Sequence, residues 1–201
     1  MTKEIQISND EDFIMLDYGS KFESGLAYHE FLSKYGTDEQ RRRWEATHEK
    51  VALTAGQREL LASFKRDMKV LCLAGAWCGD CVNQCPIFEH FAICTPRIQI
   101  RYFDRDANPD LGQALSVCGG ARVPALLFLS EDNFQVGFYG DRTLSKYRKM
   151  VADEFGAACP TGIVPEQTSL LADVTQDWLD EFERIQLILR TSGRLRKLHG
   201  D

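Results

Sequence analysis

Two cysteines separated by two residues, Cys78 and Cys81, have the type and spacing to do chemistry. They stand in the segment LCLAGAWCGDCVNQCP, residues 71–86. A CxxC pair serves redox centres, zinc sites and iron–sulfur sites alike, so its surroundings decide between them. Here the pair follows a short apolar run and precedes a helical pattern. A single CxxC at such a strand-to-helix junction favours a redox pair.

A zinc site is the main chemical alternative. Structural zinc needs four protein ligands, usually with a second Cys/His pair. None of the nearest candidates forms a second CxxC or a CxxH; they are Cys85, His90, Cys94 and Cys118. We therefore expect no bound metal, although Cys85 and Cys118 keep the zinc alternative open.

The helix expected after the pair would make its two cysteines unequal. If this helix begins near Gly79, unpaired backbone N–H groups and the helix dipole stabilise a thiolate at Cys78. Such a site can lower a thiol pKa from about 8.5 toward about 7. Cys78 is then the predicted nucleophile. Cys81, one turn further along and more buried, is predicted to resolve the mixed disulfide.

Hydrophobic periodicity predicts the elements that position this pair. The N-terminal third reads as helical, with one helix over residues 21–35 and capping boxes at Thr37–Gln40 and Thr54–Gln57 opening two more. The latter helix carries its apolar stripe as far as Met68. The final amphipathic helix carries apolar residues from Val174 to Leu189.

The middle of the chain alternates strands with helices. This order predicts an α/β fold: a βαβ unit, extended by a β-hairpin and covered by helices on both faces. We expect the chain to divide into three segments. They are a helical N-terminal extension (1–53) packed on the core, a core domain (54–157), and a C-terminal segment (158–201) that contains a connection at 160–165 and a helix. The expected strands are 70–76, 98–104, 125–129 and 134–138, and the expected helices 79–94, 108–120 and 141–155.

Charge and composition limit the class of partner. The net charge of −6 argues against nucleic acid or an anionic membrane, because phosphate contacts need clustered Lys and Arg. The basic runs at 41–43 and 190–197 read as solvated helix faces. The N-terminal MTKEIQISND lacks a signal-peptide core and no apolar run could span a bilayer, so we expect a cytoplasmic protein with reduced thiols.

Several motifs in the right order resemble the thioredoxin family over residues 54–157. They are WCGDC (77–81) after a buried strand, Pro86 five residues past the second cysteine, DANP (106–109), and Val123–Pro124 opening the next strand. More narrowly, the chain resembles bacterial thioredoxin-like proteins with an added helical N-terminus. The resemblance implies a thioredoxin-like fold: a mixed sheet of about four strands flanked by helices, with extra helices at both termini.

The resemblance also implies an activity and site roles. The protein would be a thiol–disulfide oxidoreductase that cycles between a dithiol and a disulfide, acting on disulfide-containing proteins. A partner reductase would supply electrons, so no bound cofactor is implied. Pro124 would be cis beside the pair, the Val123 backbone would bind an extended substrate, and Trp77 would form an apolar platform.

Two departures from typical thioredoxins concern the residues around the pair. Asp80 replaces a proline, and Cys72 replaces a buried aspartate that assists the second cysteine. Asp80 is either a first-turn acid that stabilises the helix, or a charge that raises the pKa of Cys78 or moves a proton to or from Cys81. With Gly79, it would then tune the reduction potential.

The remaining thiols and a noncatalytic alternative complete the expectations. Cys85 is expected to be a small buried residue beside Pro86, with an alternative disulfide or a metal as the other interpretation. Cys118 is the thiol more expected to lie near Pro124, and Cys72, Cys94 and Cys159 are expected to be core or boundary thiols. A noncatalytic interaction module on the same fold is a further alternative. The presence of both cysteines of the pair and Pro124 weakens it.

Overall fold

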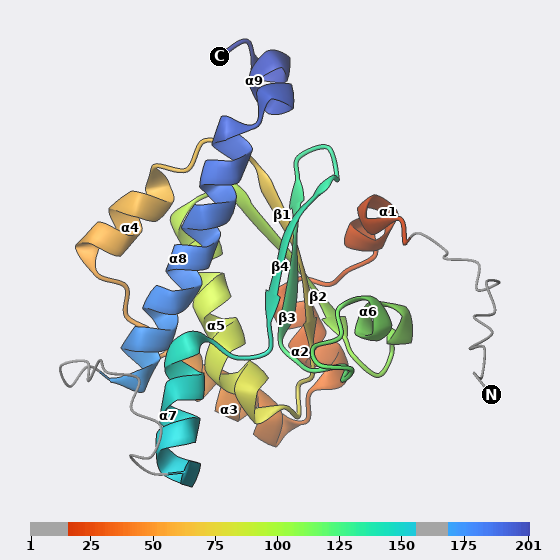
Figure 1. Cartoon of the computed structure of the whole chain (residues 1–201). Coiled ribbons are helices and arrows are strands. Elements are labelled where there is room, and N and C mark those ends of the chain that lie inside the picture. The colour runs from red at the N-terminus through yellow and green to blue at the C-terminus, as the bar shows by residue number, and fades with distance from the viewer. Residues whose placement is uncertain (1–15, 156–168) are drawn as a thin grey trace, which may run out of the picture.

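A four-stranded mixed sheet forms the centre of the molecule in the computed structural model, which describes residues 16–155 and 169–201. The strand order is β2-β1-β3-β4; β1 and β2 are parallel, and the other pairings are antiparallel (Figure 1). This arrangement confirms the predicted α/β fold with its parallel crossover and hairpin. The strands are β1 (Met68–Ala74), β2 (Ile98–Asp104), β3 (Ala125–Ser130) and β4 (Gln135–Gly140).

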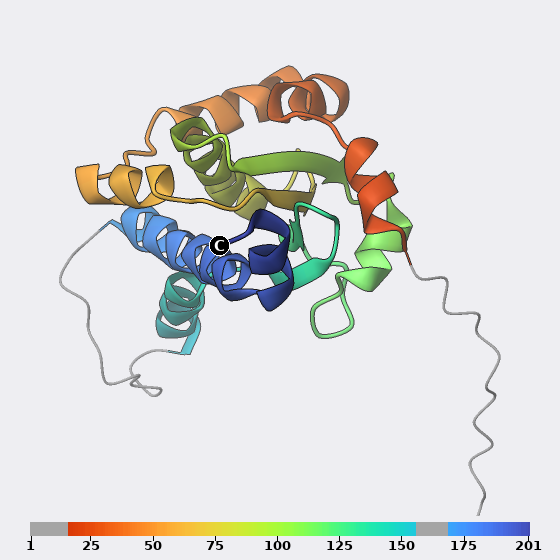
Figure 2. The same cartoon turned by 90° about the horizontal axis from the view of Figure 1, so that it is seen from above.

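Helices cover both faces of the sheet, as Figure 2 shows from above. Helices α5 and α8 lie on one face, while α1 and α6 lie on the other, and α2 contacts β2. The helices are α1 (Tyr18–Glu23), α2 (Tyr28–Tyr35), α3 (Asp38–His48), α4 (Ala55–Ala62), α5 (Gly79–Cys94), α6 (Pro109–Ala114), α7 (Leu144–Phe155), α8 (Leu170–Thr191) and α9 (Gly193–His199). None of those described is long and apolar enough to cross a membrane.

Local signals in the sequence predict several helix boundaries correctly. Helix α5 spans the predicted residues 79–94. Both predicted capping boxes are present: Thr37 with Gln40 opens α3, and Thr54 with Gln57 opens α4. In each, the hydroxyl accepts from the backbone N–H three residues later, and the glutamine side chain accepts in return.

Tertiary pairing overrides the helical pattern in the N-terminal third. The single helix predicted over 21–35 is wrong: α1 ends at Glu23 and α2 begins at Tyr28. Between them, the backbone of Leu26 pairs with that of Tyr102 in β2, through N–H···O bonds of 3.1 and 2.8 Å. Met68, predicted on a helical stripe, instead opens β1, where its backbone N–H donates to Arg97.

Other boundaries also differ from the prediction. Helix α6 is six residues long rather than reaching Gly120, because a turn with Cys118 and Gly119 at positive φ follows it. The basic run 190–197 is helical as expected, but it divides at Ser192 between the end of α8 and a separate short helix, α9. The N-terminal residues 1–15, Cys159 and the connection predicted at 160–165 lie outside the described residues.

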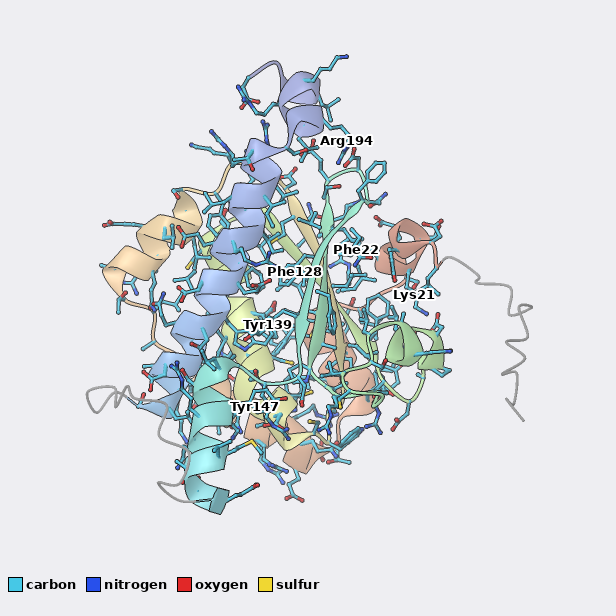
Figure 3. All side chains as sticks on the ribbon, viewed as in Figure 1. Lys21, Phe22, Phe128, Tyr139, Tyr147 and Arg194 are labelled. Carbon is cyan, nitrogen blue, oxygen red and sulfur yellow. The ribbon has the colours of Figure 1, made fainter. Side chains whose placement is uncertain are left out.

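Two buried tryptophans fix the terminal helices to the core. The Trp44 indole in α3 donates to the Ala76 carbonyl at 2.9 Å, just before the cysteine pair. The Trp178 indole in α8 donates to the side chain of Gln84 in α5 at 2.8 Å. Ring contacts extend this interface: Phe128 of β3 points toward α8, where it meets Phe182 edge-on (Figure 3).

The buried carboxamide of Gln84 yields a stability prediction. It accepts from Trp178 and donates to the Asp141 carbonyl at 3.2 Å, so Gln84→Leu leaves two buried polar groups without this partner. Each such group costs about 1–3 kcal/mol. Urea unfolding should therefore show a loss of about 2 kcal/mol or more. Gln113→Leu, at an exposed helical position, is the matched control; equal losses for the two variants would contradict the prediction.

Candidate active site

Cys78 and Cys81 lie where β1 passes into α5. Strand β1 ends at Ala74, and Cys78 is the N-cap of the helix. Cys78 is partly exposed, whereas Cys81 is fully buried behind it. The Cys78 thiol donates to the Val123 carbonyl at 3.5 Å, and the Gly75 N–H donates to Cys81 Sγ at 3.4 Å. The pair thus has one sulfur that a reagent can reach, that of Cys78, and one that is shielded from solvent, that of Cys81.

The two thiols share a proton. The hydrogen bond to Cys81, together with burial, raises the pKa of Cys78. Burial also raises the pKa of Cys81, but hydrogen bonds from Cys78, Cys85 and the Gly75 N–H outweigh it and lower this pKa to about 5. The pair therefore loses its first proton well below the ordinary thiol pKa and holds the second between the sulfurs.

Backbone groups at the start of α5 favour a charge on Cys78 only in part. The N–H groups of Asp80 and Cys81 favour its thiolate, but the hydrogen bond to Cys81 and burial outweigh them, so the prediction of a lowered pKa at Cys78 is wrong and the lowered pKa belongs to Cys81. Because Cys81 is fully buried, an external reagent meets the shared charge at Cys78.

The loop before β3 completes the site. The Val123–Pro124 peptide bond is cis, and both residues are buried. The contact from Cys78 to the Val123 carbonyl brings this loop against the pair although 45 residues separate them. The structure thus brings together Cys78, Cys81 and the segment predicted to bind substrate.

Trp77 presents an apolar surface beside Cys78. Its side chain is 43% exposed, and the Arg105 guanidinium lies 4.4 Å from the ring centroid. The indole packs so closely on Gly75 that any side chain there would overlap it. Arg105 is a site residue that sequence reasoning missed, since the run that contains it carries no signal of stacking on a distant ring.

Asp80 forms an ion pair with Arg142, a second missed residue. Arg142 Nη2 and Nε lie 2.7 and 2.9 Å from Asp80 Oδ2, and Lys146 Nζ lies 3.9 Å from Oδ1. The buried Asp141 carboxylate also contacts Arg142, at 3.2 Å, and accepts from the Tyr147 hydroxyl at 3.0 Å. Figure 3 shows Tyr147 on α7. The Asp80 charge therefore stands beside the pair with a fixed counter-charge.

The other thiols divide into two groups. Cys72 and Cys85 are fully buried with their sulfurs 4.0 Å apart, which agrees with the buried role predicted for both. Cys118 is exposed in the turn after α6, and no contact found among the described residues joins it to the pair. Nor does any group of three or more His, Cys, Asp or Glu side chains in the described part of the chain form a metal site, so the zinc alternative gains no support.

Comparisons with known proteins agree with this geometry. A family model described as Thioredoxin matches residues 25–154, which include α2 and α3 of the segment assigned to the N-terminal extension. Protein disulfide-isomerase erp38 of Neurospora crassa is 31% identical over 105 residues, covering 49% of this chain. The match covers only 28% of that longer protein.

Two solved structures share the fold over most of this chain. A protein of unknown function, PA1234 from Pseudomonas aeruginosa, has a TM-score of 0.66 at 18% identity, covering 88% of this chain and 98% of the other. An HIV epitope scaffold has a TM-score of 0.61 at 19% identity, covering 83% and 99%. At these identities the likeness concerns the fold alone.

The shared proton predicts the pH dependence of alkylation. In the reduced protein, iodoacetamide labelling of the Cys78 peptide, followed by mass spectrometry, should rise with pH around a midpoint above about 8.5, because the hydrogen bond to Cys81 and burial keep the proton on Cys78. Cys81→Ala removes that hydrogen bond, so it should move the midpoint downward. A wild-type midpoint at or below that of Cys81→Ala would contradict this account.

The Asp80–Arg142 pair predicts a shift in reduction potential. Arg142→Gln leaves the Asp80 carboxylate with only the more distant Lys146 as counter-charge, which disfavours the thiolate and so destabilises the reduced form relative to the disulfide. A loss of roughly 1 kcal/mol corresponds to a potential about 20 mV more negative, measured against glutathione.

Two further variants make that measurement specific. Adding Asp80→Asn to Arg142→Gln should restore the potential, since it removes the uncompensated charge. Arg122→Gln is the matched control, because Arg122 contacts Asp141 at 3.6 Å and has no ion pair with Asp80 among those found. An equal shift of the reduction potential in Arg122→Gln would contradict a specific role of the Asp80–Arg142 pair and would show that Arg142 acts through general surface charge.

Proposed function

The chain belongs to the thioredoxin family, and on that premise we propose that it reduces protein disulfides with the Cys78/Cys81 pair. The observation that carries the proposal is the placement of a partly exposed thiol at the N-terminus of α5, with a buried thiol directly behind it. This geometry suits a nucleophile and a resolving thiol.

The proposed reaction has two exchange steps. The Cys78 thiolate attacks one sulfur of a substrate disulfide, forming a mixed disulfide and releasing the first substrate thiolate. Cys81 then gives its proton to the first substrate thiolate and attacks Cys78 Sγ, which releases the second substrate thiolate. This thiolate takes from solvent the proton that Cys78 lost on ionising. Substrate gains two electrons and two protons, and the protein is left with a Cys78–Cys81 disulfide.

The surface around Cys78 suits an extended polypeptide. Trp77 offers an apolar platform backed by Arg105, and the Val123 carbonyl lies 3.5 Å from the Cys78 sulfur. We propose that substrates cross Trp77 and bind along residues 123 and 124. A partner reductase would return the electrons, and the proposed setting is the cytoplasm, where such a pair is kept reduced.

A mixed-disulfide trap tests the proposal. Cys81→Ser removes the resolving thiol, so substrate proteins should remain covalently bound to Cys78 and be released by dithiothreitol. Cys94→Ser, which alters a thiol of the same helix far from the pair in sequence, should trap nothing and keep wild-type insulin reduction.

The same preparation separates the alternatives. Absence of both trapped partners and insulin reduction would overturn the redox proposal in favour of a noncatalytic interaction module. Stoichiometric zinc in the purified protein, lost on mutation of either cysteine of the pair, would favour the metal-binding alternative instead.

A further inference from the structure

Two more thiols, those of Cys85 and Cys72, lie in the core near the redox pair. Cys85 lies on α5 one turn beyond Cys81, on the same face of the helix, and both side chains are fully buried. Cys72 lies on the central strand β1, with its Sγ 4.0 Å from that of Cys85. Cys78, Cys81, Cys85 and Cys72 thus follow one another from the partly exposed N-terminus of α5 to the buried central strand.

The spacing of α5 explains this alignment. Residues three and four apart share one face of a helix, so the first three cysteines of the series face the sheet together. Cys72 meets them because β1 runs directly into the turn before the helix. A disulfide needs sulfurs about 2.05 Å apart, so the sulfurs of Cys72 and Cys85, in contact at 4.0 Å, would have to approach each other by about 2 Å.

We propose that Cys72 and Cys85 are a second, buried dithiol that reduces the Cys78–Cys81 disulfide within the same molecule. This inference rests on the proposed function, since it concerns what happens after one turnover. The buried pair would act as an electron reserve that allows a second substrate to be reduced before any reductase arrives.

The exchange balances in two steps. Cys85 attacks Cys81 Sγ; the Cys81–Cys85 bond forms, the Cys78–Cys81 bond breaks, and Cys78 takes the proton that Cys85 loses. Cys72 then attacks Cys85 Sγ, forming the Cys72–Cys85 bond, while Cys81 leaves and takes the proton of Cys72. Two electrons and two protons pass from the buried pair to the surface pair, and no other reactant is consumed.

Because Cys72 and Cys85 are buried, exchange with the Cys78–Cys81 disulfide is the route by which they would be oxidised. Cys72 and Cys85 have no exposed surface, so a disulfide reagent cannot reach them in the folded protein. Burial also raises the pKa of each, which keeps both thiols protonated in the folded protein. Oxidation of Cys72 and Cys85 must therefore pass through Cys81.

Electron stoichiometry tests the proposal. The background keeps only the four cysteines of the series, with Cys94, Cys118 and Cys159 changed to serine. After full reduction and removal of reductant, the folded protein is mixed with excess 5,5′-dithiobis(2-nitrobenzoate). The expected result is about two equivalents of reagent reduced, and one equivalent in Cys85→Ala or Cys72→Ala, since two electrons reduce one disulfide.

Peptide mapping of the products assigns the bonds. The four-cysteine protein should contain a Cys72–Cys85 disulfide, and Cys81→Ala should leave both inner thiols reduced because the route is cut. If the core variants fail to fold, as judged by near-UV circular dichroism, the map of the four-cysteine protein alone decides.

The outcomes distinguish this inference from the proposed function. A Cys78–Cys81 disulfide with Cys72 and Cys85 still reduced would overturn the electron reserve and leave the oxidoreductase proposal intact. Oxidised inner thiols in Cys81→Ala would overturn the relay. No reagent reduced by any variant, with no Cys78–Cys81 disulfide, would overturn the proposed function itself.

Discussion

The side-chain amide of Gln84 joins the three parts of the molecule on which the site depends. It lies in α5, accepts from Trp178 of α8, and donates to the Asp141 carbonyl in the loop after β4. It also approaches the Asp80 carbonyl at 3.3 Å, within the CxxC motif. A buried amide must satisfy its donors and acceptor, so these three segments are held in one arrangement. The contacts of Gln84 therefore hold the start of α5, and Cys78 with it, in place.

The helical segments at both ends of the chain are therefore part of the support of the site. Trp44 of α3 binds the Ala76 carbonyl, two residues before Cys78, while Trp178 of α8 binds the helix that follows. Both indoles are fully buried. The strand-to-helix turn is thus clamped from two sides by residues more than 30 positions away in the chain.

Electrostatics at the site follow from the same packing. An acid inside the CxxC motif would by itself disfavour the thiolate. Here the loop between β4 and α7 brings Arg142 onto Asp80, and Asp141 holds Arg142 from its other side. Cys72, where typical thioredoxins carry a buried acid, faces Cys85 instead. In this chain, the acidic side chain near the pair is therefore Asp80, which lies in a partly buried ion pair with Arg142.

The elements whose signals are local could be predicted from the residues: the cysteine pair at the N-terminus of α5, the two capping boxes, and the alternation of buried strands with helices. Their causes lie within a few residues, so periodicity and capping chemistry reveal them. Four features could not be predicted in this way: the break at Leu26, the pairing of Arg142 with Asp80, the stacking of Arg105 on Trp77, and the contact of Cys72 with Cys85. Each joins residues far apart in the chain, and only the packing of the sheet and its helices determines which distant side chains meet.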